Sequence, residues 1–206
     1  MIKKTFIAFA IYFSFVSFVF AQYDLVDVWK LDTTIVLDIR YATTNNFTGK
    51  QVYDEAKFFL RTEPAKKILE VQKELKSLGL CLKIFDGYRP LSIQKKFWEI
   101  LPDERYVADP KKGSRHNRGA AVDLTLVDKN GYEIPMPTPY DDFTDKASRN
   151  YMDLPSQIII NRKFLEDLMT KYGFIGMPTE WWHFDYNGWE KYDVLDVDFK
   201  DLENGK

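Results

Sequence analysis

The chain has 206 residues, with 29 basic and 31 acidic side chains and a formal net charge of −2. This balance gives no electrostatic reason to expect nucleic acid or an anionic membrane surface as a partner. Cys81 is the only cysteine, so an internal disulfide is excluded and the core must hold the domain together unaided. Because Cys81 lies in an apolar run, we expect a small buried hydrophobic side chain rather than a nucleophile.

The first 21 residues have the pattern of a secretory signal peptide. Lys3 and Lys4 form a basic start, an apolar and aromatic stretch follows, and Ala21 is a small residue suited to cleavage before Gln22. An uncleaved anchor is the alternative, but the apolar run is short for a spanning helix. We expect an exported protein, periplasmic or secreted, with no stable membrane anchor after cleavage. Residues 22–206 are sufficient for a single domain with a sizeable core.

Periodicity and turn residues predict four strands and three helices in this domain. The strands are predicted at residues 34–41, 80–85, 120–127 and 181–186. The helices are predicted at residues 62–78, 91–101 and 156–172. Glycines 79 and 173 can end the first and third helices in the left-handed conformation. Helices and strands do not alternate strictly, so we predict an α+β fold: a single domain with a central antiparallel sheet flanked by helices.

The first helix should bury one apolar stripe against that sheet. The stripe consists of Ala65, Ile68, Leu69, Val71, Leu75 and Leu78. In the next helix, Phe97 and Trp98 are expected to pack inward. Residues 109–118 and 135–145 are polar or proline-rich and are predicted to be loops.

Two histidines, His116 and His183, are the only ones in the chain. Asp123 lies on the small-residue face of the third predicted strand, and Gly119 allows the chain to fold back between His116 and Asp123. Two imidazoles and one carboxylate are a sufficient ligand set for a zinc site with one position left open for water. For either residue alone, a surface histidine or a turn-capping aspartate is the competing interpretation.

Glu180 precedes His183 by three residues and follows Pro178 closely. Positions three apart on a regular strand face opposite sides, so Glu180 must lie on irregular backbone just before the strand. The spacing differs from the helical His-Glu-x-x-His motif, so a hydrolase here is of another type. In the mechanism that we predict, Glu180 takes a proton from the attacking water and delivers it to the leaving amine.

Arg89 lies in the loop at the end of the second predicted strand, where a rigid scaffold presents functional groups. A fixed cation there could stabilise the charge that develops on a carbonyl oxygen. A structural ion pair with Asp86 is the alternative, and the sequence alone favours neither.

Together these segments resemble the VanX-type D-alanyl-D-alanine dipeptidases, zinc peptidases related to D,D-carboxypeptidases. The matching segments are Ser114-x-His116 with Asp123, Glu180-x-x-His183, Gly87-Tyr88-Arg89-Pro90 and residues 40–49. The resemblance implies that one Zn²⁺ per chain is held by His116, Asp123 and His183. It implies that Glu180 is the general base and acid, and that Arg89 stabilises the transition state. It also places Ser114 near the substrate and assigns the substrate amino group to Asp141, with the neighbouring Asp142 as the alternative.

The function implied by this resemblance is zinc-dependent hydrolysis of a small D,D-dipeptide, D-Ala-D-Ala, to two D-alanines. Family members involved in vancomycin resistance work in the cytosol, whereas this chain has the pattern of an export signal. We therefore expect a role in cell-wall peptide turnover or salvage. The alternatives are a D,D-carboxypeptidase that acts on longer peptidoglycan peptides and a non-catalytic module that binds zinc or peptidoglycan. The presence of Glu180 argues against the non-catalytic module.

Overall fold

The computed structural model describes residues 23–204, and the predicted signal peptide, residues 1–21, lies outside them. A five-stranded sheet in the order β2-β4-β5-β7-β6 forms its centre. Its strands are Val36–Leu37 (β2), Leu80–Asp86 (β4), Ala121–Asp128 (β5), Phe174–Gly176 (β6) and His183–Tyr186 (β7). The α+β prediction is confirmed. Strands β4, β5, β7 and β6 are antiparallel, but β2 runs parallel to β4 at the edge.

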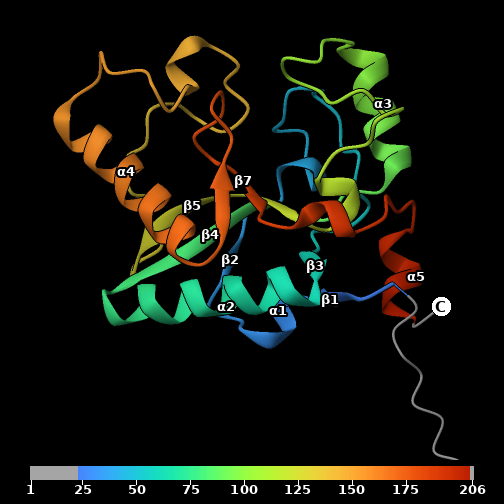
Figure 1. Cartoon of the computed structure of the whole chain (residues 1–206), viewed down its shortest axis with the longest axis horizontal. Helices are drawn as coiled ribbons and strands as arrows, with labels where there is room; N and C mark the ends of the chain where they lie inside the picture. Colours follow the sequence, from blue (N-terminus) through green and yellow to red (C-terminus); the bar gives the residue numbers. More distant parts are fainter. Residues whose placement is uncertain (1–22, 205–206) are drawn as a thin grey trace, which may run out of the picture.

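In the part of the chain that the structure describes, five α-helices and a small second sheet surround this centre. The second sheet pairs Leu25–Asp27 (β1) with Phe59–Arg61 (β3). The helices are Val28–Leu31 (α1), Thr62–Ser77 (α2), Leu91–Ile100 (α3), Ser156–Lys171 (α4) and Phe199–Glu203 (α5). In Figure 1, α2 runs along the bottom of the view, α4 stands at the left and α3 at the upper right. Within residues 23–204, no helix is both long enough and apolar enough to cross a membrane.

Helix α2 follows from its apolar pattern, as predicted. Its buried face contacts β4, and Ala65, Ile68, Val71 and Leu75 are each at most 1% exposed. Burying side chains of this kind stabilises the fold by about 1.5–3 kcal/mol for each large aliphatic residue. Leu78 was predicted to belong to the buried stripe, but it is 56% exposed because it follows the last helical residue.

The strand predicted at residues 34–41 is mostly wrong. Only Val36–Leu37 pairs with β4, and Arg40–Ala42 form a 3-10 turn. Three side chains of the predicted apolar face are nevertheless buried, because Ile35, Ile39 and Tyr41 are all at most 3% exposed. The turn directs Tyr41 toward the candidate site described below, at the cost of strand pairing.

Other differences involve short segments and one side chain. Strands β1, β3 and β6 have three residues each and were not predicted, because so short a segment carries no alternation signal. The two tryptophans at 181 and 182 precede β7 rather than belonging to it. Cys81 is half-buried rather than fully buried, although it is unpaired as expected.

The register of the central strands determines which side chains meet. Asp123 on β5 is the direct partner of His183 on β7. On its other side, Asp123 pairs with Asp86, where an irregularity between Ile84 and Asp86 shifts the register of β4. A bulge of this kind redirects side chains at the end of a strand, and here it brings the loop after β4 toward Asp123.

Candidate metal centre

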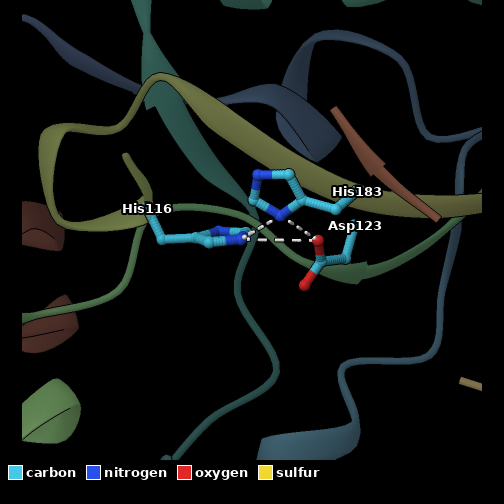
Figure 2. Close-up of side chains that lie close together, drawn as sticks. All are labelled: His116, Asp123 and His183. Carbon is cyan, nitrogen blue, oxygen red and sulfur yellow. Dashed lines mark hydrogen bonds and ion pairs between the residues drawn. The ribbon is translucent and has the colours of Figure 1, made fainter. Parts of the chain in front are cut away.

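Three potential metal ligands converge at one point, His116 from a 3-10 turn before β5, Asp123 from β5 and His183 from β7, and Figure 2 shows their side chains pointing toward one another. The Nε2 atom of His116 lies 3.2 Å from Nδ1 of His183 and 3.4 Å from Oδ1 of Asp123. The Nδ1 atom of His183 lies 2.9 Å from the same carboxylate oxygen. All three residues are buried.

These distances suit a tetrahedral zinc ion. Donors bound at about 2.0–2.1 Å from a tetrahedral zinc lie about 3.3 Å from one another. The three observed separations, 2.9, 3.2 and 3.4 Å, bracket this value. Within residues 23–204, His116, Asp123 and His183 form the group of histidine, cysteine or acidic residues that lie close enough together to hold a metal ion.

The outer atoms of the imidazoles are held by acceptors, and this determines their tautomers. The Nδ1 atom of His116 lies 2.7 Å from the carbonyl oxygen of Gly87, so it must carry the proton. The Nε2 atom of His183 lies 2.9 Å from Oδ1 of Asp185 and donates to that carboxylate. In the neutral imidazoles, Nε2 of His116 and Nδ1 of His183 therefore keep lone pairs that, together with Oδ1 of Asp123, can face one metal ion. Such contacts orient metal-binding histidines and make them more basic.

The electrostatics of the cluster favour a positive charge at its centre. Burial opposes ionisation of Asp123, but the charges of His116 and His183 and their hydrogen bonds to the carboxylate together have the larger effect. They hold the pKa of this carboxyl well below its usual range. Burial also opposes the charged form of His183, yet hydrogen bonds with Asp123 and Asp185 raise the pKa of its imidazole to about 10. Three electron-pair donors that stabilise a cation are the donor set expected of a metal site.

The cluster lies in a small pocket with a volume of about 70 Å³. All of the predicted site residues line it: Arg89, Ser114, His116, Asp123, Asp141, Glu180 and His183. An aromatic wall that includes Phe47, Phe97 and Phe143 forms part of the lining. The structure therefore brings into one cavity predicted site residues that are separated by as much as 94 positions in the chain, from Arg89 to His183.

Glu180 lies on irregular backbone immediately before the turn into β7, as its spacing from His183 indicated. Burial raises the pKa of Glu180 to about 7, with the charge of His183 opposing the shift and that of Asp123 adding to it. A carboxyl group with a pKa near neutrality can both accept and return a proton at physiological pH.

Arg89 forms the ion pair with Asp86 that was the alternative interpretation of this residue, and it also lines the pocket. Its Nε and Nη2 atoms donate to Oδ2 of Asp86 at 3.0 and 2.7 Å, and its Nη1 donates to Gln94 at 2.8 Å. Burial disfavours the charged form of Arg89, but the surrounding groups, with the negative charge of Asp86 first among them, together have the larger effect. The pKa of the guanidinium is therefore well above its usual value. The ion pair thus fixes a permanent cation in the wall of the pocket.

The two remaining predicted residues lie at the rim of the metal cluster. The Ser114 hydroxyl accepts a hydrogen bond from the backbone N–H of His116 at 3.2 Å. Asp141 lines the pocket, whereas Asp142 lies outside it and accepts from the backbone N–H of Thr144 at 2.9 Å. Burial and the charge of Asp123 raise the pKa of Asp141 to about 8, and its Oδ2 atom is buried without a hydrogen-bond partner.

Several residues of the site were not predicted. Asp185 could have been found, because it is two residues from His183 and hence on the same face of a strand. Tyr140 donates a hydrogen bond to Oδ2 of Asp123 at 3.0 Å, and Tyr41 donates to Asp141 at 3.2 Å. No local pattern marks these two tyrosines, because their partners are distant in the chain.

Two imidazoles and a carboxylate around one point, with a further carboxylate in the same pocket, are the side chains typical of a metal site of the hydrolytic type. The sequence model of the family described as D-ala-D-ala dipeptidase matches residues 21–201. The chain belongs to this family.

The D-alanyl-D-alanine dipeptidase of Escherichia coli is 33% identical over 172 residues, which cover 84% of this chain and 89% of that protein. The D-alanyl-D-alanine dipeptidase of Streptomyces coelicolor is 31% identical over 185 residues, which cover 78% of this chain and 90% of that protein. A solved structure of VanYB in complex with D-Alanine-D-Alanine is 16% identical, with a TM-score of 0.42 over 72% of this chain and 79% of that one.

Proposed function

We propose that this protein is a zinc-dependent dipeptidase that hydrolyses D-Ala-D-Ala to two molecules of D-alanine. The observation that carries the proposal is the triangle of His116, Asp123 and His183 donors, 2.9–3.4 Å apart, with Glu180 in the same pocket. The family of the chain and the names of its relatives agree with this chemistry.

The three converging donors would hold one zinc ion. When bound, zinc supplies Lewis acidity, which polarises a carbonyl group and lowers the pKa of water to about 7. Because the cluster offers three protein donors, a bound zinc ion would keep one position for water, as a catalytic site requires.

Glu180 is the group that moves the proton. Its pKa of about 7 allows it to take a proton from the water that attacks the scissile carbonyl carbon. It then returns this proton to the nitrogen of the leaving D-alanine as the carbon–nitrogen bond breaks. Arg89, held in place by Asp86 and Gln94, presents a fixed cation to the negative charge that develops on the carbonyl oxygen.

Asp141 receives the free amino group of the substrate. Its buried Oδ2 has no partner, so an ammonium group in the pocket would supply both the missing hydrogen bond and the opposite charge. Ser114 lines the same pocket and offers a hydroxyl to the substrate.

The use of Asp141 favours a dipeptide over a longer peptide, because an acylated substrate has no ammonium to place there. Turnover of D-Ala-D-Ala should therefore exceed that of an N-acetylated peptide ending in D-Ala-D-Ala by at least about 100-fold, as expected when a buried polar group is left unpaired. A strong preference for the blocked peptide would instead identify a D,D-carboxypeptidase.

The decisive experiment uses the Glu180→Gln variant. This variant should bind one equivalent of zinc by metal analysis, as the wild type does, but lose about 10²–10⁴ in kcat, the usual contribution of a general acid–base group. Chelation should abolish turnover by the wild type, and added zinc should restore it. Unchanged turnover by Glu180→Gln would remove Glu180 from the mechanism.

We further propose that the protein acts after export, in the turnover or salvage of cell-wall peptides. The support is the basic and apolar pattern of residues 1–21. Fractionation of the producing cells and mass spectrometry of the mature chain test this proposal. We expect an exported protein that begins at Gln22, and a cytosolic protein with an intact amino terminus would contradict it.

A further inference from the structure

Behind the metal cluster, two tyrosine hydroxyls join Asp123 to Asp141. Tyr140 donates to Oδ2 of Asp123 at 3.0 Å, and its oxygen lies 3.2 Å from the hydroxyl of Tyr41. The Tyr41 hydroxyl in turn lies 3.2 Å from Oδ1 of Asp141. A continuous row of contacts therefore connects a candidate metal ligand with the candidate receptor for the substrate amino group.

We infer that Tyr140 and Tyr41 are positioning residues that hold Asp123 in its metal-binding orientation and link it to Asp141. The inference rests on the proposed function for the roles of Asp123 and Asp141. It adds two residues that are not among the three candidate metal ligands. Tyr140 does not line the pocket at all, so it can act only through the residues that it contacts.

The first step concerns the two oxygens of Asp123. Oδ1 faces both imidazoles, while Oδ2 accepts from Tyr140. With Oδ2 engaged, the carboxylate presents a single oxygen to the ion and cannot rotate without breaking the bond to Tyr140. Contacts of this kind usually contribute 10–100-fold to metal affinity.

The second step is the rigidity of Tyr140. Its ring stacks on Phe85 with centroids 4.6 Å apart and an interplanar angle of 21°. The rings of Trp182 and Tyr41 make T-shaped contacts with it, with centroid distances of 5.5 and 6.1 Å. Tyr140 is 8% exposed and Tyr41 is 3% exposed. Packing on several sides locks the hydroxyl in place, which is what a positioning group requires.

The third step follows from counting protons. A tyrosine hydroxyl has one proton, and the proton of Tyr140 is committed to Asp123, because a metal-bound carboxylate only accepts. The proton of Tyr41 can then go either to Asp141 or to the Tyr140 oxygen, but not to both. When an ammonium group supplies donors to Asp141, Tyr41 is free to donate to Tyr140, which strengthens the bond from Tyr140 to Asp123.

The test is a double-mutant cycle on zinc affinity, measured without substrate by competition with a chromophoric chelator. Tyr140→Phe should weaken zinc binding by about 10-fold or more. Tyr41→Phe should weaken it by about 3-fold in the wild-type background and have no effect when residue 140 is already phenylalanine, because coupled residues are not additive. Both substitutions retain the aromatic ring and hence the packing.

Tyr88→Phe is the matched control. Tyr88 is buried, and its hydroxyl hydrogen-bonds the backbone of Val197 outside the pocket, so its loss should lower the melting temperature without changing zinc affinity. Wild-type zinc affinity in Tyr140→Phe would overturn the inference, and purely additive effects would overturn the link between the two hydroxyls. If Tyr140→Phe does not fold, the zinc affinity of Tyr41→Phe is the test. An affinity equal to that of the wild type would overturn the link between the two hydroxyls. Because no substrate is used, failure to hydrolyse D-Ala-D-Ala leaves this result unaffected.

Discussion

Asp185 and His183 lie on the same face of β7, and Oδ1 of Asp185 lies 2.9 Å from Nε2 of the His183 imidazole. The contact leaves Nδ1 of His183 to face Asp123 and His116. Asp185 is thus a carboxylate that orients the imidazole of a candidate metal ligand. The Nδ1 atom of His116 instead lies 2.7 Å from the carbonyl oxygen of Gly87, and Oδ2 of Asp86 lies farther away, at 3.9 Å.

Asp185→Asn should weaken zinc binding by about 10-fold, because the amide can still accept a hydrogen bond but no longer stabilises positive charge on the imidazole. Chelator competition on the purified protein measures the change. Asp167→Asn, on the exposed side of α4 beside Lys163, is the control and should bind zinc as the wild type does. Equal affinities for Asp185→Asn and the control would show that Asp185 does not tune the metal site.

The pH profile should report the ionisation of Glu180. The base must be ionised to accept a proton, and its pKa is about 7, so kcat/KM should fall on the acid side of neutrality. The midpoint should lie at or below pH 7, because a bound cation favours the carboxylate. Metal analysis at each pH separates this effect from zinc loss. A profile that is flat from pH 5 to 7 at constant zinc content would exclude Glu180 as the base.

Asp141 should make the metal-free protein less stable as pH rises. Its pKa is about 8 in the folded state against 3.8 as the ordinary value, so the folded protein keeps a proton that the unfolded chain has lost. The free energy of unfolding contributed by this group therefore falls as pH rises from about 4 to about 8.

Asp141→Asn removes this effect and suits the backbone, because φ at this position is +61° and asparagine tolerates the left-handed region. At pH 9 the variant should be more stable than the wild type by about 1–3 kcal/mol, the scale of a buried unsatisfied group. At pH 4 the two proteins should have equal stability. Urea unfolding of the metal-free proteins tests both points, and the gain in stability should be accompanied by a raised KM for D-Ala-D-Ala.

Arg89→Lys should lower kcat/KM by about 100-fold, the scale for loss of one group that stabilises an oxyanion. Lysine keeps the charge but cannot bridge Asp86 and Gln94 at the same time, so the cation loses its position. The zinc content should not change. Arg105→Lys, in the exposed pair with Asp103, is the control and should have wild-type kinetics. If the kcat/KM of Arg89→Lys is within about threefold of wild type, which is far less than the expected loss, Arg89 has only a structural role in its ion pair with Asp86.

Local patterns in the sequence were sufficient for α2, α3, α4 and the two long strands, β4 and β5. Each of these elements buries one recognisable set of apolar side chains and ends at a glycine, a proline or a turn. The candidate metal ligands were also visible, because the chain has only two histidines and both lie in distinctive runs. Short strands such as β3 and β6 were missed because pairing with distant partners, rather than their own composition, makes them strands.

Sequence by itself therefore determined the chemical inventory: two imidazoles, several acids and one arginine, on or next to segments of known type. Only the tertiary structure decided that Asp123 faces His183 across β5 and β7, that Asp141 rather than Asp142 enters the pocket, and that Tyr140 lies behind the cluster. The physical reason is that propensity and periodicity act over a few residues. Strand register and side-chain packing depend instead on contacts between segments that can be 60 or more residues apart.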